Sequence, residues 1–263
     1  MPRQDSLAVE AKDEANPPWI KQISTADVID ALKAGIDDFR AVPTHGVLFG
    51  VMYAIAGLFL VRVTFDYALL PMVFPVIAGF AIVGPVAGLG FYELSRRREL
   101  GLDARWWHML DAFKRPRLGA VLALGLVMTA LFFAWLAVAA FLVKLTLGTP
   151  PQGLGAFLSA VFTTPAGWTM IVFGNLLGGL FAVVAFAVGA VSFPLLLDRD
   201  VDMVTAAATS VQAVVANPKP MALWGLIVTA GLVVGTLPLF LGLAIILPML
   251  GHATWHLYRK VVA

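Results

Sequence analysis

Long charge-free apolar stretches alternate with polar segments along the chain, which predicts an all-α membrane protein. A helix needs roughly 20 residues to cross a hydrocarbon core of about 30 Å. Five intervals without Asp, Glu, Lys or Arg reach that length, and they lie between Arg40 and Arg62, Asp66 and Glu93, Arg117 and Lys144, Lys144 and Asp198, and Lys219 and Arg259.

The last two intervals are each long enough for two helices. A Gly-, Pro- and Thr-rich middle at 147–167 predicts a loop with a short interfacial helix at 156–162, followed by a helix that starts near Trp168. The sequence Gly235-Thr236-Leu237-Pro238 predicts a turn in the final interval. The chain is therefore expected to have about six transmembrane helices, although a re-entrant hairpin at 220–258 remains an alternative.

Three polar segments, each ending before a proline, repeat one pattern ahead of the apolar stretches. Apolar residues recur in them at steps of three and four, as on one face of an α-helix. Ser24 and Asp27 form a plausible N-terminal cap for the first. The three stripes are Val28, Leu32, Ile36 and Phe39; Leu102, Trp106, Met109 and Phe113; and Val201, Val204, Ala208, Val211 and Val215.

This repetition predicts three similar units, each an amphipathic interfacial helix followed by a hairpin of two spans. The prolines that end the surface helices are Pro43, Pro116 and Pro218. The units extend over about 24–95, 96–197 and 198–263, within a single membrane domain at 23–263. Residues 1–22 mix both charge signs with a Pro-Pro pair and predict a disordered tail.

Composition and charge support this assignment and add an orientation. The chain has 60% hydrophobic residues, 13% charged residues and a mean hydropathy of +0.89, far from the soluble globular range. With six spans, all of the 18 Lys and Arg residues except Arg62 and Lys144 fall on one side. Positive residues are retained in the cytoplasm, so both termini are expected there.

Five strings of the chain carry a family resemblance, and they lie at 37–45, 90–99, 163–168, 192–200 and 251–260. They are similar to those of the DUF2189 family of uncharacterised bacterial inner-membrane proteins. The similarity extends over nearly the whole chain after the tail and implies a polytopic helical protein of the bacterial inner membrane. The family has no established activity, so it supplies no catalytic residue.

Some members of that family are labelled as resembling a cytochrome oxidase subunit, and His252 and His256 are the residues that test this label. Two histidines four apart on a helix can ligate a metal or haem. They are weak candidates, because the chain has only four histidines and this pair lies beside the membrane exit. No cofactor is therefore expected. No Ser/His/Asp or paired-carboxylate arrangement is evident either, so we expect no enzyme.

Small residues inside the apolar stretches are expected to pack helices together, because spacing by four lets two helices approach closely. The candidates are Gly84, Gly88, Gly174, Asn175 and Gly178. Glu93 stands at the end of a span, directly before three arginines, and a local salt bridge is the simplest expectation for it.

The loop at 96–117 is the most distinctive polar segment. Cations and paired indoles at a membrane surface attract anionic lipid head groups, each cation contributing about 1 kcal/mol. Enforcement of topology with an aromatic anchor is an equally good explanation, and nucleic acid is not an expected partner. The candidate residues are Arg96, Arg97, Arg98, Arg105, Trp106, Trp107, Lys114, Arg115 and Arg117.

Two function classes follow. The first is a non-catalytic accessory, assembly or lipid-interacting membrane module, with a membrane-protein partner or a second copy as possible companions. The second is a permease-like carrier of a neutral or lipid-like substrate, since the chain has no ionisable residue near the middle of a span. A haem- or metal-binding respiratory subunit is a more distant alternative.

Overall fold

The computed structural model of the chain describes residues 18–42, 51, 55, 57–59, 62, 70–77, 84–85, 88–114, 118–149, 153–238 and 240–263. Regular structure in these residues is helical, apart from one isolated antiparallel bridge between Ile20 and Val262. The all-α prediction is therefore confirmed for the described part. Most of the first predicted hairpin, together with Pro43 and Pro116, lies outside the described residues. Among the parts of this hairpin that are described is a short 3₁₀ turn, η1 (Leu70–Met72).

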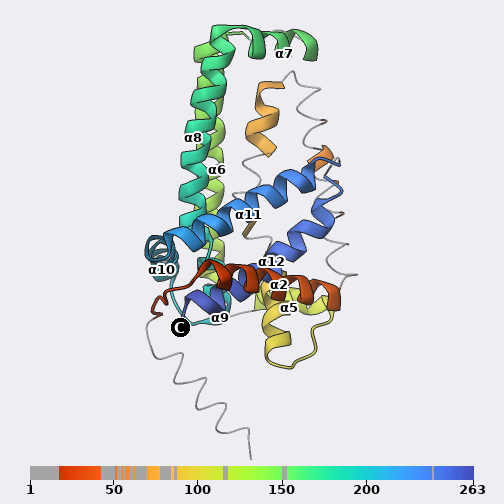
Figure 1. Cartoon of the computed structure of the whole chain (residues 1–263), viewed down its shortest axis with the longest axis vertical. Helices are drawn as coiled ribbons and strands as arrows, with labels where there is room; N and C mark the ends of the chain where they lie inside the picture. The colour runs from red at the N-terminus through yellow and green to blue at the C-terminus, as the bar shows by residue number, and fades with distance from the viewer. Residues whose placement is uncertain are drawn as a thin grey trace, which may run out of the picture.

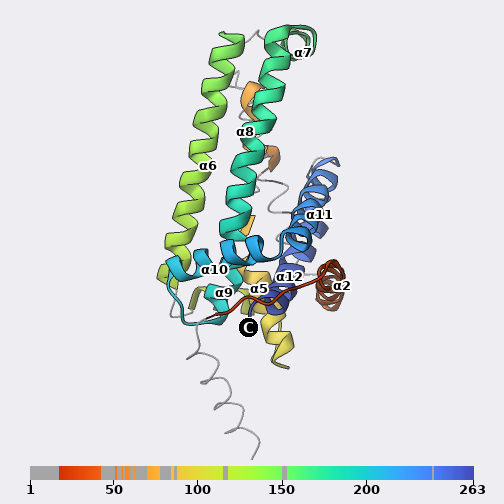
Figure 2. The ribbon, with the colours of Figure 1, turned by 60° about the vertical axis from the view of Figure 1, so that its left-hand side comes forward.

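Three helices of the described residues are long and apolar enough to cross a membrane, where the sequence predicts six. They are α6 (Leu118–Leu147), the segment Pro165–Asp198, and α11 (Pro218–Thr236). The middle segment consists of α8 (Pro165–Gly189) continued by α9 (Ser192–Asp198). Figures 1 and 2 show α6 and α8 running side by side as a long pair. The last predicted span, α12 (Leu243–Val261), does not qualify, because its second half carries polar and charged side chains.

The predicted loop helix is present as α7 (Leu154–Thr163), which lies across one end of the α6/α8 pair (Figure 1). We call this end the α7 end. The turn into α8 is capped by Thr164, whose side chain accepts a hydrogen bond of 3.0 Å from the backbone of Gly167. Pro165 then occupies the first turn, so α8 begins three residues before the predicted Trp168.

Polar helices gather at the opposite end of the molecule (Figure 1). We call this end the base, and it is formed by α2 (Thr25–Ala41), α5 (Leu89–Glu99), the 3₁₀ helix η2 (Trp106–Lys114), α9 and the second half of α12. The capping box of Ser24 and Asp27 starts α2 as predicted. The central contact of α2 is with α12, and Gly35 permits it, because a Cβ there would lie 2.4 Å from the backbone nitrogen of Ala253.

The predicted apolar stripes of the three surface helices lie in different ways in the structure. In α2 the buried positions are Val28, which belongs to the predicted stripe, and Ala31, Gly35 and Asp38 beside it. The second segment forms the 3₁₀ helix η2, in which Met109 is the buried member of the predicted stripe. In α10 (Met203–Ala216), which is capped by Asp202 and lies crosswise to α6 and α8 in Figure 2, the predicted stripe points outward.

Residues 18–22 are held against the other end of the chain instead of continuing a free tail. The backbone of Trp19 exchanges hydrogen bonds with Ala263 at 3.2 and 3.0 Å, and the N–H of Lys21 donates to Val261 at 2.9 Å. The buried side chain of Asn217 completes this contact: its amide oxygen accepts from Ile23 N–H at 2.8 Å, and its nitrogen donates to the Lys21 carbonyl at 3.0 Å. Residues 1–17 lie outside the described part.

Candidate functional site

A buried carboxylate in the base joins three helices through a cluster that we call the Asp38 cluster. The Ser95 hydroxyl on α5 donates to Asp38 Oδ2 at 2.5 Å, and His256 Nε2 on α12 lies 2.8 Å from the same oxygen. The guanidinium of Arg98 approaches Asp38 Oδ1 at 3.1 Å and the Asp38 carbonyl at 3.3 Å. The fifth member, His252, lies behind Ser95, with Nδ1 2.8 Å from its hydroxyl oxygen.

These contacts keep Asp38 ionised although it is only 6% exposed. Burial on its own would raise its pKa, but hydrogen bonds from His256 and Ser95 and the charges of the two histidines outweigh burial. The pKa of Asp38 is therefore lowered from its ordinary value. Since Ser95 directs its proton to the carboxylate, its oxygen accepts from Nδ1–H of His252 in this arrangement.

The residue types of a serine hydrolase meet here, but their connections differ. In a catalytic triad the serine donates to histidine, and the carboxylate holds the far nitrogen of the ring. Here Ser95 bonds directly to the carboxylate, and His252 Nδ1 lies 3.9 Å from Asp38 Oδ2. The Ser95 side chain is also completely buried. The arrangement is suited to holding α2, α5 and α12 together.

A second ionic group connects α9 to α5 and α12. The Tyr258 hydroxyl donates to Asp198 at 2.7 Å, and Arg259 reaches the same carboxylate at 3.3 Å. Arg259 also bonds to Glu99 at 3.0 Å, which accepts in addition from the indole of Trp255 at 2.9 Å. The last turns of α5, α9 and α12 are therefore bound to one another by charge-assisted contacts.

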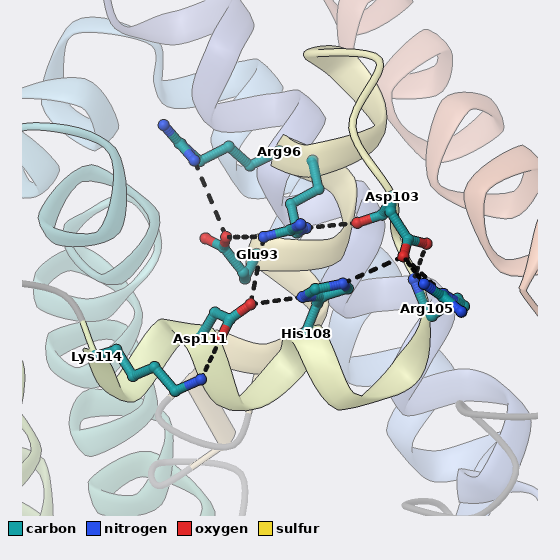
Figure 3. A network of polar contacts seen from close by, with 8 residues as sticks. Glu93, Arg96, Asp103, Arg105, His108, Asp111 and Lys114 are labelled. Atoms are coloured by element: carbon teal, nitrogen blue, oxygen red, sulfur yellow. Dashed lines mark hydrogen bonds and ion pairs between the residues drawn. The ribbon is translucent and has the colours of Figure 1, made fainter.

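A third network fixes η2 against α5 (Figure 3). Glu93, at 1% side-chain exposure, faces Arg96 and Arg97 at 3.9 Å, as the sequence predicted. Arg97 continues to Asp111 at 3.3 Å. Asp111 also contacts Lys114 at 2.7 Å and His108 at 2.6 Å, and these two contacts lower its pKa to about 2. Arg96, Arg97 and Lys114 of this loop are thus paired with acids of the same chain.

Comparison with known proteins bears on the middle of the chain. The profile of the family described as a predicted integral membrane protein (DUF2189) matches residues 73–198. Over these residues, which we call the DUF2189 region, the chain is similar to that family. Searches of curated proteins and of solved structures gave no match. The family match is narrower than the resemblance in the sequence, since the strings at 37–45 and 251–260 lie outside it.

The DUF2189 region and its flanks build the base jointly. The region supplies Ser95 and Arg98 of the Asp38 cluster, whereas Asp38 itself and His256 come from opposite flanks of the chain. The Asp198 group is shared in the same way, because Tyr258 belongs to the C-terminal flank. The polar site is therefore complete only with the segments outside the matched residues.

The cations predicted to hold lipid are largely engaged inside the protein. Arg96 and Arg97 have side chains 19% and 18% exposed and face Glu93. Arg105 pairs with Asp103 at 2.6 Å and stacks over the ring of Trp107 at 4.3 Å. The indoles of Trp106 and Trp107 are 43% and 41% exposed, whereas Arg115 and Arg117 lie outside the described residues.

The predicted packing residues divide into two groups. A Cβ at Gly178 would lie 3.0 Å from the ring of Trp135, and one at Gly174 would lie 3.6 Å from Leu142, so both glycines face α6. Gly88 is crowded by its own neighbour Tyr92, whereas Gly84 has open space around it. The Asn175 amide donates to Ile171 of its own helix at 2.7 Å and forms no hydrogen bond to another helix among the described residues.

His252 and His256 lie close together as predicted, but they contact Asp38 and Ser95. No group of three or more His, Cys, Asp or Glu side chains among the described residues is arranged to hold a metal ion. Sequence reasoning missed Asp38 and Ser95 as partners of these histidines. A signal existed, because both residues fall inside the strings that carry the family resemblance.

Proposed function

We propose that this protein is a non-catalytic membrane module that interacts with lipid through an apolar face of α10. The observation that carries the proposal is the exposure of Val204, Val211 and Val215, at 67%, 38% and 73%. These residues belong to the stripe that the sequence marks as the apolar face of a surface helix. Val211 and Val215 also border a shallow groove with Ile20.

The inward face of α10 explains this orientation. Ser210 accepts a hydrogen bond from the backbone of Val191 at 3.1 Å, and Ser192 donates to the carbonyl of Ala206 at 3.2 Å. Small residues are therefore used for packing against α8 and α9, and the valines remain outside. An exposed row of valines on a helix is costly in water and favourable at the acyl boundary, by roughly 1.5–3 kcal/mol for each fully buried side chain.

The position of α10 supports lipid as the partner. It lies between two of the membrane-spanning candidates, following the segment that ends at Asp198 and leading directly into α11 at Pro218. The helix contains no Lys or Arg, so apolar burial rather than charge would drive its insertion. Trp106 and Trp107 offer a second contact of the kind found in interfacial aromatic belts.

We place the base on the cytoplasmic side of a bacterial inner membrane. The distribution of Lys and Arg supports this orientation, since positively charged segments are retained in the cytoplasm. The carrier alternative is less favoured, because two grooves formed by the described residues, one between α6 and α8 and one beside α10, are lined mostly by apolar side chains. A hydrolytic function is less favoured because Ser95 is buried.

A labelling experiment tests the proposal directly, because the chain has no cysteine and each introduced cysteine is unique. Val211→Cys and Val215→Cys would carry an environment-sensitive fluorophore in lipid nanodiscs, and Lys33→Cys on the exposed face of α2 would be the control. Nitroxide-labelled phospholipids are expected to quench the α10 probes strongly and the α2 probe weakly. Equal, weak quenching at all three positions would contradict the proposal.

A further inference from the structure

A groove between α6 and α8 lies near the α7 end, far from α10 and the base. Its volume is about 460 Å³, and it is open to the outside along the helix pair. Both helices contribute apolar side chains over more than one turn, which gives the groove an elongated wall. The side chains that matter below are Phe141, Leu145, Thr146, Thr169, Phe173 and Leu177.

The groove offers apolar contact and little hydrogen bonding. Its two hydroxyl groups already donate to their own helices, Thr146 to the Leu142 carbonyl at 2.8 Å and Thr169 to the Pro165 carbonyl at 2.9 Å. A ligand with polar groups along its length would lose its water without gaining partners there. A hydrocarbon chain has no such cost, and the volume is in the range of small-molecule sites.

Lys144 is a cation that lies beside the groove. Lys144 lies one helical turn from Phe141, which puts their side chains next to each other on α6. Its side chain is exposed and forms no ion pair with any residue that the structure describes. The sequence has no Asp or Glu between Arg117 and Asp198. Lys144 therefore has a free positive charge close to the end of a span, where lysine reaches the head-group layer.

We propose that this groove binds one acyl chain of an anionic phospholipid whose head group is held by Lys144. The site is distinct from the α10 face, being at the opposite end of the α6/α8 pair and entirely within the DUF2189 region. This inference rests on the proposed function, because it takes from it that the ligand is a lipid, and it adds a specific binding site. The acyl chain supplies the apolar contact, and Lys144 supplies a preference for negative charge.

The test uses the full-length protein, purified in mild detergent and analysed by native mass spectrometry with phosphatidylglycerol or phosphatidylcholine added. Thr169→Trp would fill the groove, and Thr229→Trp is its control, since Thr229 is an exposed threonine that bonds to its own helix on α11 in the same way. Lys144→Gln removes the charge, Lys144→Arg restores it, and Lys219→Gln is the control at an exposed lysine of the other end.

Wild-type protein is expected to retain one phospholipid more than Thr169→Trp, while Thr229→Trp behaves as wild type. Lys144→Gln should lower the preference for phosphatidylglycerol over phosphatidylcholine by about fivefold, the effect of one interfacial cation. Lys144→Arg and Lys219→Gln should keep it. Circular dichroism confirms that each variant is folded before binding is compared.

Two results would overturn the inference. One is retention of the same number of lipids by wild type and folded Thr169→Trp, and the other is an unchanged lipid preference in Lys144→Gln. Neither result concerns α10, whose insertion is measured by the quenching of its own probes. Quenching at Val215 with no loss of lipid in Thr169→Trp would support the proposed function and reject the groove as a lipid site. Loss of lipid in Thr169→Trp without quenching at Val215 would support the groove and reject the proposed role of α10.

Discussion

Two adjacent aspartates on α2 have opposite environments. Asp37 has a side chain 72% exposed and lies 3.8 Å from Arg40, whereas Asp38 is buried among Ser95, Arg98 and His256. Exposed ion pairs contribute little to stability, but loss of a buried acceptor leaves its donors unsatisfied. The free energy of unfolding should therefore respond very differently to the two residues.

We predict that Asp38→Ala lowers the free energy of unfolding by about 2–4 kcal/mol, because Arg98 and the hydroxyl of Ser95 lose their acceptor. Asp37→Ala is the matched control and should change it by less than about 0.5 kcal/mol. Thermal unfolding in nanodiscs, followed by circular dichroism, measures both. Similar losses in the two variants would show that burial of Asp38 is unimportant.

The lowered pKa of Asp38 also fixes the sign of a pH effect. A carboxylate whose folded pKa lies below its ordinary value of 3.8 stabilises the fold above that pH, and the contribution is lost as pH falls through the folded pKa. The difference in unfolding temperature between wild type and Asp38→Asn should thus be constant from pH 7 to about 5 and shrink below about 4. A difference that disappears already at pH 6 would contradict the assignment.

Nothing in the local sequence distinguishes Asp38 from Asp37. The apolar stripe on α2 suggests which side faces inward, but the buried row runs through Ala31 and Gly35, and small residues contribute little to such a pattern. The partner that buries Asp38 is the C-terminal half of α12, which is distant in sequence. The sequence therefore predicts a helix at this position but does not predict the burial of Asp38.

At the scale of the elements, local sequence signals predict where each helix lies in the chain, but they do not predict which face of the helix packs against the rest of the protein. The capping box of Ser24, the loop helix α7 and the turn after Thr236 all lie where the sequence places them. Yet the valine stripe of α10 is exposed, because Ser210 and the small residues beside it pack inward. A hydrophobic stripe indicates an apolar environment, and in a membrane protein that environment includes the lipid.

Close contact between α2 and α12 gives a prediction at Gly35. A methyl group there would lie 2.4 Å from the backbone of Ala253, and backbone atoms cannot yield as a flexible side chain can. Gly35→Ala should therefore destabilise the protein by about 1–3 kcal/mol. Gly119→Ala, on α6 with open space around it, should be neutral or slightly stabilising. Thermal unfolding of both variants tests this, and destabilisation by Gly119→Ala alone would reverse the argument.

At the scale of the whole molecule, residues 19–21 pair with the C-terminal residues 261–263, and Asn217 stabilises this pairing. Its amide groups bond to the backbone of Lys21 and Ile23, so Asn217→Ala should cost about 1–3 kcal/mol and increase cleavage near 18–24 in limited proteolysis. Asn175→Ala is the matched control, since that amide donates to Ile171 of its own helix, and it should leave the cleavage pattern unchanged. Unchanged cleavage in Asn217→Ala would mean that the terminal pairing holds without it.

The charge distribution predicted that polar segments would gather at one end, and they do. The charge distribution does not predict which acid pairs with which base there, because many of the basic residues have several acidic residues nearby in the sequence. Arg98 illustrates this, because it pairs with Asp38 although Glu93 is closer to it in the sequence. Such choices depend on how three separate helix ends meet.

The contact between Asp38 and His256 spans 218 residues of sequence. On the ribosome, α2 is made well before α12, so Asp38 can meet Ser95 and Arg98 early but can meet His256 only after the intervening helices have been synthesised. A chain that stops short of His256 leaves this acid without that partner. Completion of the base is therefore a late event in biogenesis, and an incomplete copy would expose an unsatisfied acid to cellular quality control.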